Sequence, residues 1–202
     1  ADMGDHEEDK DEYKVPTKVG LNDLLERDKD DAALESYKKQ LLGTNFYSPK
    51  DDPRRVVIVE MHVLFEDRPA GDVVFKGLDS QANLDKLKKS SVVFKESCHY
   101  KLKFVFRVQH DIVTGLRYHN GVYKTGIRVA KEDLMLGSYP PQEAVQEVVW
   151  PRHGWEEAPS GMLARGSYKS TIKFIDDDDV THLQFDYGFS IKKDWGKDKD
   201  EE

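Results

Sequence analysis

Apolar and polar residues alternate along most of the chain after Pro53, with the two-residue period of half-buried β-strands. The clearest run is 100–108, whose Lys and Arg residues lie on the face opposite its apolar ones. The apolar face of this run comprises Leu102, Phe104, Phe106 and Val108. The run therefore predicts a core strand with one solvated face.

A second long run begins at Arg55 and also places its apolar residues on one face. These residues are Val57, Val59, Met61, Val63 and Phe65. The other expected elements are a strand at 91–95, a hairpin over 112–129 with its turn at 119–121, a closing pair at 163–175 and 183–191, a brief helical turn within 79–89, and an irregular connection at 139–159. Seven or more strands without a long helix predict an all-β, antiparallel sandwich.

The pattern changes before Pro53, which divides the chain into an arm, 1–52, and a β domain, 53–202. The first twelve residues are mostly acidic and are expected to be disordered. A short helix is predicted from Asp30 or Asp31 to Leu42, because Gly43 suits its C-terminal cap. Its apolar stripe comprises Leu34, Tyr37, Leu41 and Leu42. The arm cannot form its own core, so it packs on the β domain or folds on a partner.

Composition narrows the possible partners. The 202 residues carry a formal charge of −8 and 35% charged side chains, which opposes binding to nucleic acid or to an anionic bilayer and favours a basic partner. Cys98 is the single cysteine, and the N-terminus shows no apolar leader, so a cytoplasmic location is expected. No apolar run approaches the roughly 18 residues of a membrane span, so stable membrane association is not expected.

Little in the sequence indicates catalysis, a cofactor or a metal. The seven histidines are scattered without the paired spacing of a zinc site, and no glycine-rich loop links a strand to a helix. The acidic run 176–179 leaves three alternatives open: a solvated turn, part of a calcium site, or a docking site for basic residues of a partner. The sequence thus indicates a binding protein.

Several ordered motifs resemble the Rho GDP-dissociation inhibitor family. The most distinctive is GMLARGSY at 161–168, which follows EEAP at 156–159 and precedes an acidic run. The other motifs are DKDD at 28–31, LLG at 41–43, FKE at 94–96, FRV at 106–108, GSY at 137–139 and IKKDW at 191–195. The resemblance extends from Tyr13 to Trp195.

This resemblance implies an immunoglobulin-like sandwich with a flexible arm, acting as a noncatalytic regulator without a cofactor. Such proteins bind prenylated Rho-family GTPases, preferentially in the GDP form, slow nucleotide release and extract the GTPase from membranes. The regulator is expected to be a monomer alone and a heterodimer with its GTPase. The implied GTPase contacts are Asp31, Tyr37, Leu41 and Asp178. The implied geranylgeranyl-binding residues are Val63, Val92, Tyr100, Ile112, Leu163 and Tyr187.

Two further features follow from the resemblance. Ser91 and Ser167 stand at positions that are phosphorylated in relatives. Ser170 stands where the family commonly has an apolar residue. The wall of the lipid site that the strand 168–174 forms is therefore expected to differ from that of relatives. Two alternatives stay open: a general prenyl-protein shuttle, which would not need the arm, and a calcium-dependent membrane module built on 176–179.

Overall fold

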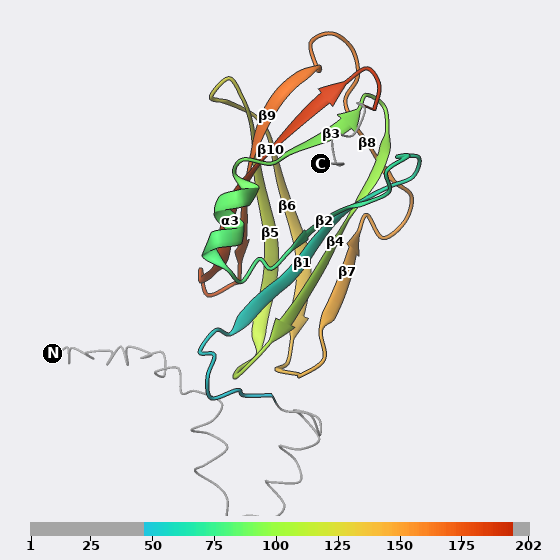
Figure 1. Ribbon diagram of the computed structural model, residues 1–202. Helices are drawn as coiled ribbons and strands as arrows, with labels where there is room; N and C mark the ends of the chain where they lie inside the picture. The colour runs from blue at the N-terminus through green and yellow to red at the C-terminus, as the bar shows by residue number, and fades with distance from the viewer. Residues whose placement is uncertain (1–46, 196–202) are drawn as a thin grey trace, which may run out of the picture.

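The computed structural model describes residues 47–195, which form two packed β-sheets (Figure 1). The first sheet has the order β2-β1-β4-β7, with β8 also paired to β4. Its strands are β1 (Val56–Phe65), β2 (Val73–Lys76), β4 (His99–Val108), β7 (Gln146–Trp150) and β8 (Glu156–Glu157).

The second sheet has the order β3-β10-β9-β5-β6. Its strands are β3 (Ser91–Lys95), β5 (Val113–Lys124), β6 (Ile127–Tyr139), β9 (Gly166–Ile175) and β10 (Thr181–Lys192). One helix, α3 (Gln81–Leu87), lies between β2 and β3 in the described part of the chain. The immunoglobulin-like sandwich is thereby confirmed, with one refinement: β3 pairs with β10 in parallel, whereas the other described pairs are antiparallel.

The alternation predicted for β4 is confirmed, but that of β1 is shifted at one point. A bulge between Ile58 and Glu60 changes the register of β1 against β4. Because a one-residue shift exchanges the two faces of a strand, the core residues before the bulge are Val56 and Ile58, where the sequence predicted Val57 and Val59. After the bulge, Met61, Val63 and Phe65 face the core as predicted.

The predicted hairpin exists, but its turn lies further along the chain than the predicted position, 119–121. Asn120 and Gly121 lie within β5, and the chain reverses at Thr125 and Gly126, between the register partners Lys124 and Ile127. Both turn residues have positive φ, 49° and 82°, as a two-residue turn of type I′ requires. The Asn-Gly pair misled the sequence prediction because the Asn120 side chain is buried in the sheet.

The connection predicted as irregular contains two strands. β7 pairs with β4 along Gln146–Trp150, and β8 pairs with the start of β4. β7 forms one edge of the first sheet, and its partly exposed residues and flanking prolines leave no alternation that would predict a strand.

The solid core lies in one half of the sandwich. Phe104 from β4 packs between the sheets against Tyr118 of β5 and Phe174 of β9, with ring centroids 4.8 Å and 5.8 Å away. All three rings are at most 1% exposed. The predicted closing pair is confirmed as β9 and β10, and a bulge between Thr181 and Leu183 adjusts its register.

Candidate functional site: an inter-sheet cavity and an acidic turn

The other half of the sandwich encloses a cavity of about 470 Å³. Its lining residues place it between β4 of the first sheet and the strands of the second, beside the loop 158–165. Figure 1 shows β8, which precedes this loop, at one end of the sandwich. The walls come mainly from apolar and aromatic side chains: Leu102 from β4, Tyr118 and Val122 from β5, and Phe189 and Ile191 from β10. An apolar ligand of moderate size suits such walls.

Aromatic contacts hold one wall of the cavity. Tyr168 stacks on Phe189 with ring centroids 5.0 Å apart and an interplanar angle of 8°. Phe94 meets Phe189 and Tyr100 edge to face, at 5.5 Å and 5.4 Å. This chain of rings links β9, β10, β3 and β4, so both sheets contribute to a preformed wall.

A loop with an exposed apolar tip borders the cavity. Its tip residues Met162 and Leu163 are 85% and 94% exposed, and Leu163 also lines the cavity. Lys124 Nζ donates to the carbonyl oxygens of Leu163 and Arg165, at 2.6 Å and 2.9 Å. The tip is therefore held in place while its side chains stay in water.

An ion pair and a backbone hydrogen bond fix this loop to Glu96, the residue that follows β3. Arg165 donates twice to Glu96, at 2.9 Å and 2.7 Å, and the Gly161 amide also donates to Glu96. The Arg165 hydrogen bond, aided by the Gly161 amide, lowers the pKa of the half-buried Glu96 carboxyl. The loop is therefore held from two sides, by Lys124 at the end of β5 and by Glu96 just after β3.

Two polar side chains, Asn120 and Glu132, line the cavity, and the fully buried Ser170 is hydrogen-bonded to Asn120 from outside its lining. Ser170 of β9 donates to the Asn120 carbonyl oxygen, and Asn120 donates to Glu132 of β6 at 3.3 Å. Burial raises the pKa of the half-buried Glu132 carboxyl, and Asn120 opposes the rise. Burial also raises the pKa of Tyr187, the register partner of Ser170, to about 12.

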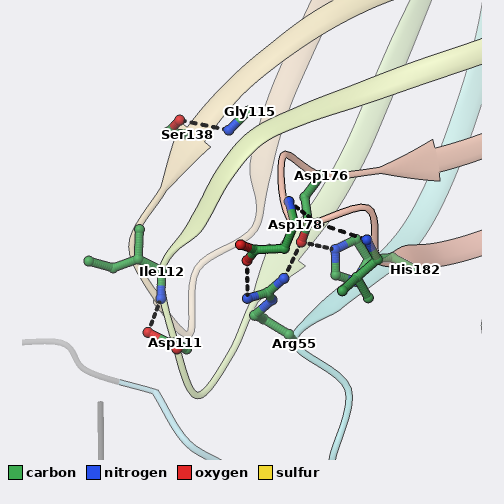
Figure 2. A network of polar contacts seen from close by, with 9 residues as sticks. Arg55, Asp111, Ile112, Gly115, Ser138, Asp176, Asp178 and His182 are labelled. Atoms are coloured by element: carbon green, nitrogen blue, oxygen red, sulfur yellow. Dashed lines mark hydrogen bonds and ion pairs between the residues drawn. The ribbon is translucent and has the colours of Figure 1, made fainter. Parts of the chain in front are cut away.

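The structure brings together three of the six residues predicted for lipid binding. Tyr100, Leu163 and Tyr187 line the cavity. Val63 and Val92 are buried in the core without lining it. The sixth residue, Ile112, lies beside Asp111 at the opposite end of the sandwich and is 37% exposed (Figure 2).

Sequence reasoning missed most of the cavity walls. Alternation places Leu102 and Val122 on the inner faces of their strands, but it does not distinguish a cavity wall from the core. The polar residues Asn120 and Glu132 gave no such signal, since polar residues are normally assigned to the solvated face.

The acidic turn between β9 and β10 lies at the end away from the cavity, and its aspartates have different environments. The Asp176 side chain is fully buried and accepts hydrogen bonds from Arg55, from His182 Nε2 at 2.8 Å and from the Asp178 amide at 3.0 Å (Figure 2). Asp177 and Asp178 remain 48% and 37% exposed, although each contacts an arginine. Asp176 therefore supports the turn, whereas Asp177 and Asp178 face outward.

The pKa values of Asp176 and His182, the buried pair of the turn, are both lowered. Burial pushes the Asp176 pKa upward, but the His182 hydrogen bond, the Val180 amide and Arg55 together bring it below its ordinary value. Burial lowers the His182 pKa, against the pull of Asp176. At neutral pH the turn thus holds an ionised aspartate beside a neutral histidine.

The chain enters the sandwich at this same end. His110 anchors the entering segment: Nε2 donates to the Asp52 carbonyl at 2.6 Å, so Nδ1 accepts from the Ser48 hydroxyl at 2.8 Å. Arg55 then reaches the acidic turn. The predicted arm contacts Asp31, Tyr37 and Leu41 lie outside the described residues.

The acidic turn and the cavity mark opposite ends of the second sheet. β9 begins at Gly166, next to the cavity loop, and ends at Ile175, next to Asp176. At about 3.3 Å per residue, its ten residues span about 30 Å. Within residues 47–195, no group of three or more His, Cys, Asp and Glu side chains could hold a metal ion, and the described helix is not long and apolar enough to cross a membrane.

Comparison with known proteins identifies the family. The model of the RHO protein GDP dissociation inhibitor family matches residues 1–194. The chain belongs to the Rho GDP-dissociation inhibitor family. It is similar to rho GDP-dissociation inhibitor 1 of Dictyostelium discoideum, with 51% identity over 185 residues that cover 91% of this chain and 92% of that protein.

Relatives from animals and fungi agree with this assignment. Rho GDP-dissociation inhibitor 1 of Homo sapiens is 38% identical over 91% of this chain and 86% of its own length. Rho GDP-dissociation inhibitor of Schizosaccharomyces pombe is 36% identical over 94% of this chain and 92% of its own length. The protein is thus a Rho GDP-dissociation inhibitor, a regulator of Rho GTPases, as the sequence motifs predicted.

Proposed function

We propose that this inhibitor holds a prenylated Rho-family GTPase at two separate places. The inter-sheet cavity takes the geranylgeranyl group, and the end with the acidic turn, together with the arm, binds the GTPase itself. The observation that carries the proposal is the cavity of about 470 Å³, which has apolar walls and an exposed apolar residue, Leu163, at its edge.

The energetics require both contacts. A geranylgeranyl group has about twenty carbons, and burial gains about 0.8 kcal/mol per methylene, so the gross gain exceeds ~10 kcal/mol. A bilayer offers almost the same gain, because the lipid leaves one apolar environment for another. Extraction is therefore driven by the additional protein contact, and one molecule that carries both sites raises the effective concentration of the second.

The acidic end suits the protein part of the complex. Asp177 and Asp178 face outward there, near the point where the arm joins the sandwich. We propose that Asp178 contacts the GTPase or its basic C-terminal segment, and that Asp31, Tyr37 and Leu41 of the arm contact the switch regions. Binding at the switches favours the GDP form and slows nucleotide release.

This function needs no cofactor and no catalytic residue, because the inhibitor acts by binding. We propose a monomer that becomes a heterodimer with its GTPase in the cytoplasm. Ser91 and Ser167 are exposed at the starts of β3 and β9, so a kinase could reach either hydroxyl without unfolding the sheet. Phosphorylation at these two serines stays a prediction.

Liposome extraction tests the proposal. The Ala130→Trp variant places an indole in the cavity, which Ala130 lines. The matched control is Lys131→Trp, an exposed position next in sequence on β6. We expect Ala130→Trp to lose extraction of geranylgeranylated GTPase and still to slow GDP release from unprenylated GTPase, while Lys131→Trp retains both. Full extraction by Ala130→Trp would overturn the assignment of the lipid to this cavity.

A further inference from the structure

The inner face of the second sheet carries a continuous row of polar side chains. Glu132 of β6 is the register partner of Asn120 of β5, and Ser170 of β9 is the register partner of Tyr187 of β10. The Ser170 hydroxyl, donating to Asn120, joins the two pairs diagonally. The row crosses four strands in the interior of the sandwich.

This polar row lies between the cavity and the solid core. Asn120, Glu132 and Tyr187 line the cavity, Ser170 is fully buried outside its lining, and the core residue Tyr118 also reaches the cavity. Two residues further toward the acidic turn, the same four strands carry buried side chains: Leu134, Tyr118, Ile172 and Phe185. Two residues toward the opposite end, they carry cavity-lining ones: Ala130, Val122, Tyr168 and Phe189. The row is therefore the floor of the cavity, where the innermost part of a bound chain would lie.

Glu132 is the ionisable carboxyl of this floor, and its surroundings do not favour a charge. Its hydrogen-bond donor is Asn120, and each donor in the row points toward it: Ser170 to Asn120, and Asn120 to Glu132. Among residues 47–195, no lysine, arginine or histidine lines the cavity.

None of the other described ionisable groups around the floor supplies a positive charge that would stabilise an ionised Glu132. Tyr118 on β5, Tyr187 on β10 and Tyr100 on β4 are neutral phenols, because burial raises the pKa of each. Glu156 on β8 acts on Glu132 with a like charge. An apolar ligand that displaced water from the floor would remove the remaining solvation of an ionised Glu132.

We propose that Glu132 is a specificity-determining residue of the cavity. When the Glu132 carboxyl is protonated, the cavity admits a fully apolar chain to its floor. When the carboxyl is ionised, binding of that chain is disfavoured. This inference rests on the proposed prenyl binding. Burial already raises the pKa of Glu132 in the free protein. Bound lipid raises it further, so by linkage lipid binding tightens as the pH falls.

The test uses an uncharged probe, N-acetyl-S-geranylgeranyl-cysteine methyl ester, titrated into the full chain by calorimetry below its micellar concentration. Between about pH 8 and about pH 5, we expect the Kd of the wild type to fall about tenfold, the effect of one unit of pKa shift on ligand binding. Glu132→Gln keeps an acceptor for Asn120 and should bind with the tighter Kd across the whole range.

The matched control is Asp133→Asn. Asp133 is the next carboxylate on β6, lies 43% exposed and pairs with His119 at 3.4 Å, so this variant should retain the pH dependence of the wild type. If the wild-type Kd does not change with pH, or if the pH dependence persists in Glu132→Gln, the role of Glu132 is overturned. The proposed lipid binding is unaffected by either result. If the probe binds at no pH, both this inference and the proposed lipid binding fail.

A second measurement covers the case in which Glu132→Gln does not fold. The pKa of Glu132, followed by carboxyl-carbon NMR in the wild type, should rise when the probe is added. An unchanged pKa in the saturated complex would overturn the inference.

Discussion

Leu163→Ala is expected to weaken lipid binding without destabilising the free protein. Leu163 lines the cavity, yet its side chain is 94% exposed before any ligand binds. A bound isoprenoid would cover this side chain, and burying a leucine side chain contributes about 1.5–3 kcal/mol. Loss of about 2 kcal/mol corresponds to about thirtyfold weaker binding. Because the residue is exposed, the free energy of unfolding should change by less than about 0.5 kcal/mol.

The assay is a fluorescence titration with a geranylgeranylated peptide from a GTPase C-terminus, and Met162→Ala is the control. Met162 is 85% exposed in the same loop but does not line the cavity. Its substitution should leave both the Kd and the urea unfolding curve of the wild type nearly unchanged. The reasoning is refuted if Leu163→Ala binds within about twofold of the wild type, or if Met162→Ala weakens binding equally.

Three further predictions concern the acidic end. Asp176→Ala should lower the free energy of unfolding in urea by about 3–5 kcal/mol, because it removes the buried partner of the buried His182 and leaves Arg55 with only the half-exposed Asp178. Asp177→Ala, at an exposed ion pair, should cost at most about 1 kcal/mol. Folding lowers the pKa of His182. The contribution of His182 to stability is therefore present above the pKa of the unfolded chain, about 6.5, and is lost as the pH falls below that value. A melting temperature that is constant from about pH 8 to about pH 5 would contradict this. Raising salt should weaken GTPase capture in the wild type, and Asp178→Asn should show a smaller salt dependence in the same extraction assay.

Much of the fold could be predicted because the strands bury one face. The alternation in β4 and in the β9–β10 pair reflects burial directly, so those elements were found. The errors occurred where backbone geometry overrides alternation: the bulge at Ile58 and the turn at Thr125 depend on dihedral angles, and propensity at single residues does not determine them. β7 was missed because an edge strand with partly exposed residues lacks a strong pattern.

The site was less predictable than the fold, for a different reason. Core and cavity residues occupy the same inner faces, so alternation cannot separate Val63, which is in the core, from Tyr187, which lines the cavity. The family motifs select Leu163, which lines the cavity, but also Ile112, which the structure holds near the acidic turn. Only the packing of the two sheets shows where space remains between them.

The cavity arises from a change of side-chain chemistry along continuous strands. In β9, Ile172 and Phe174 fill the interior completely, whereas Ser170, two residues earlier, is small and hydrogen-bonded to Asn120. Ala130 of β6 lines the cavity at an exposed position, and its small side chain leaves the space beside it open. A larger apolar residue at Ala130 would occupy volume that a ligand needs. The packed half thus supplies the stability that allows the other half of the same strands to remain open for binding.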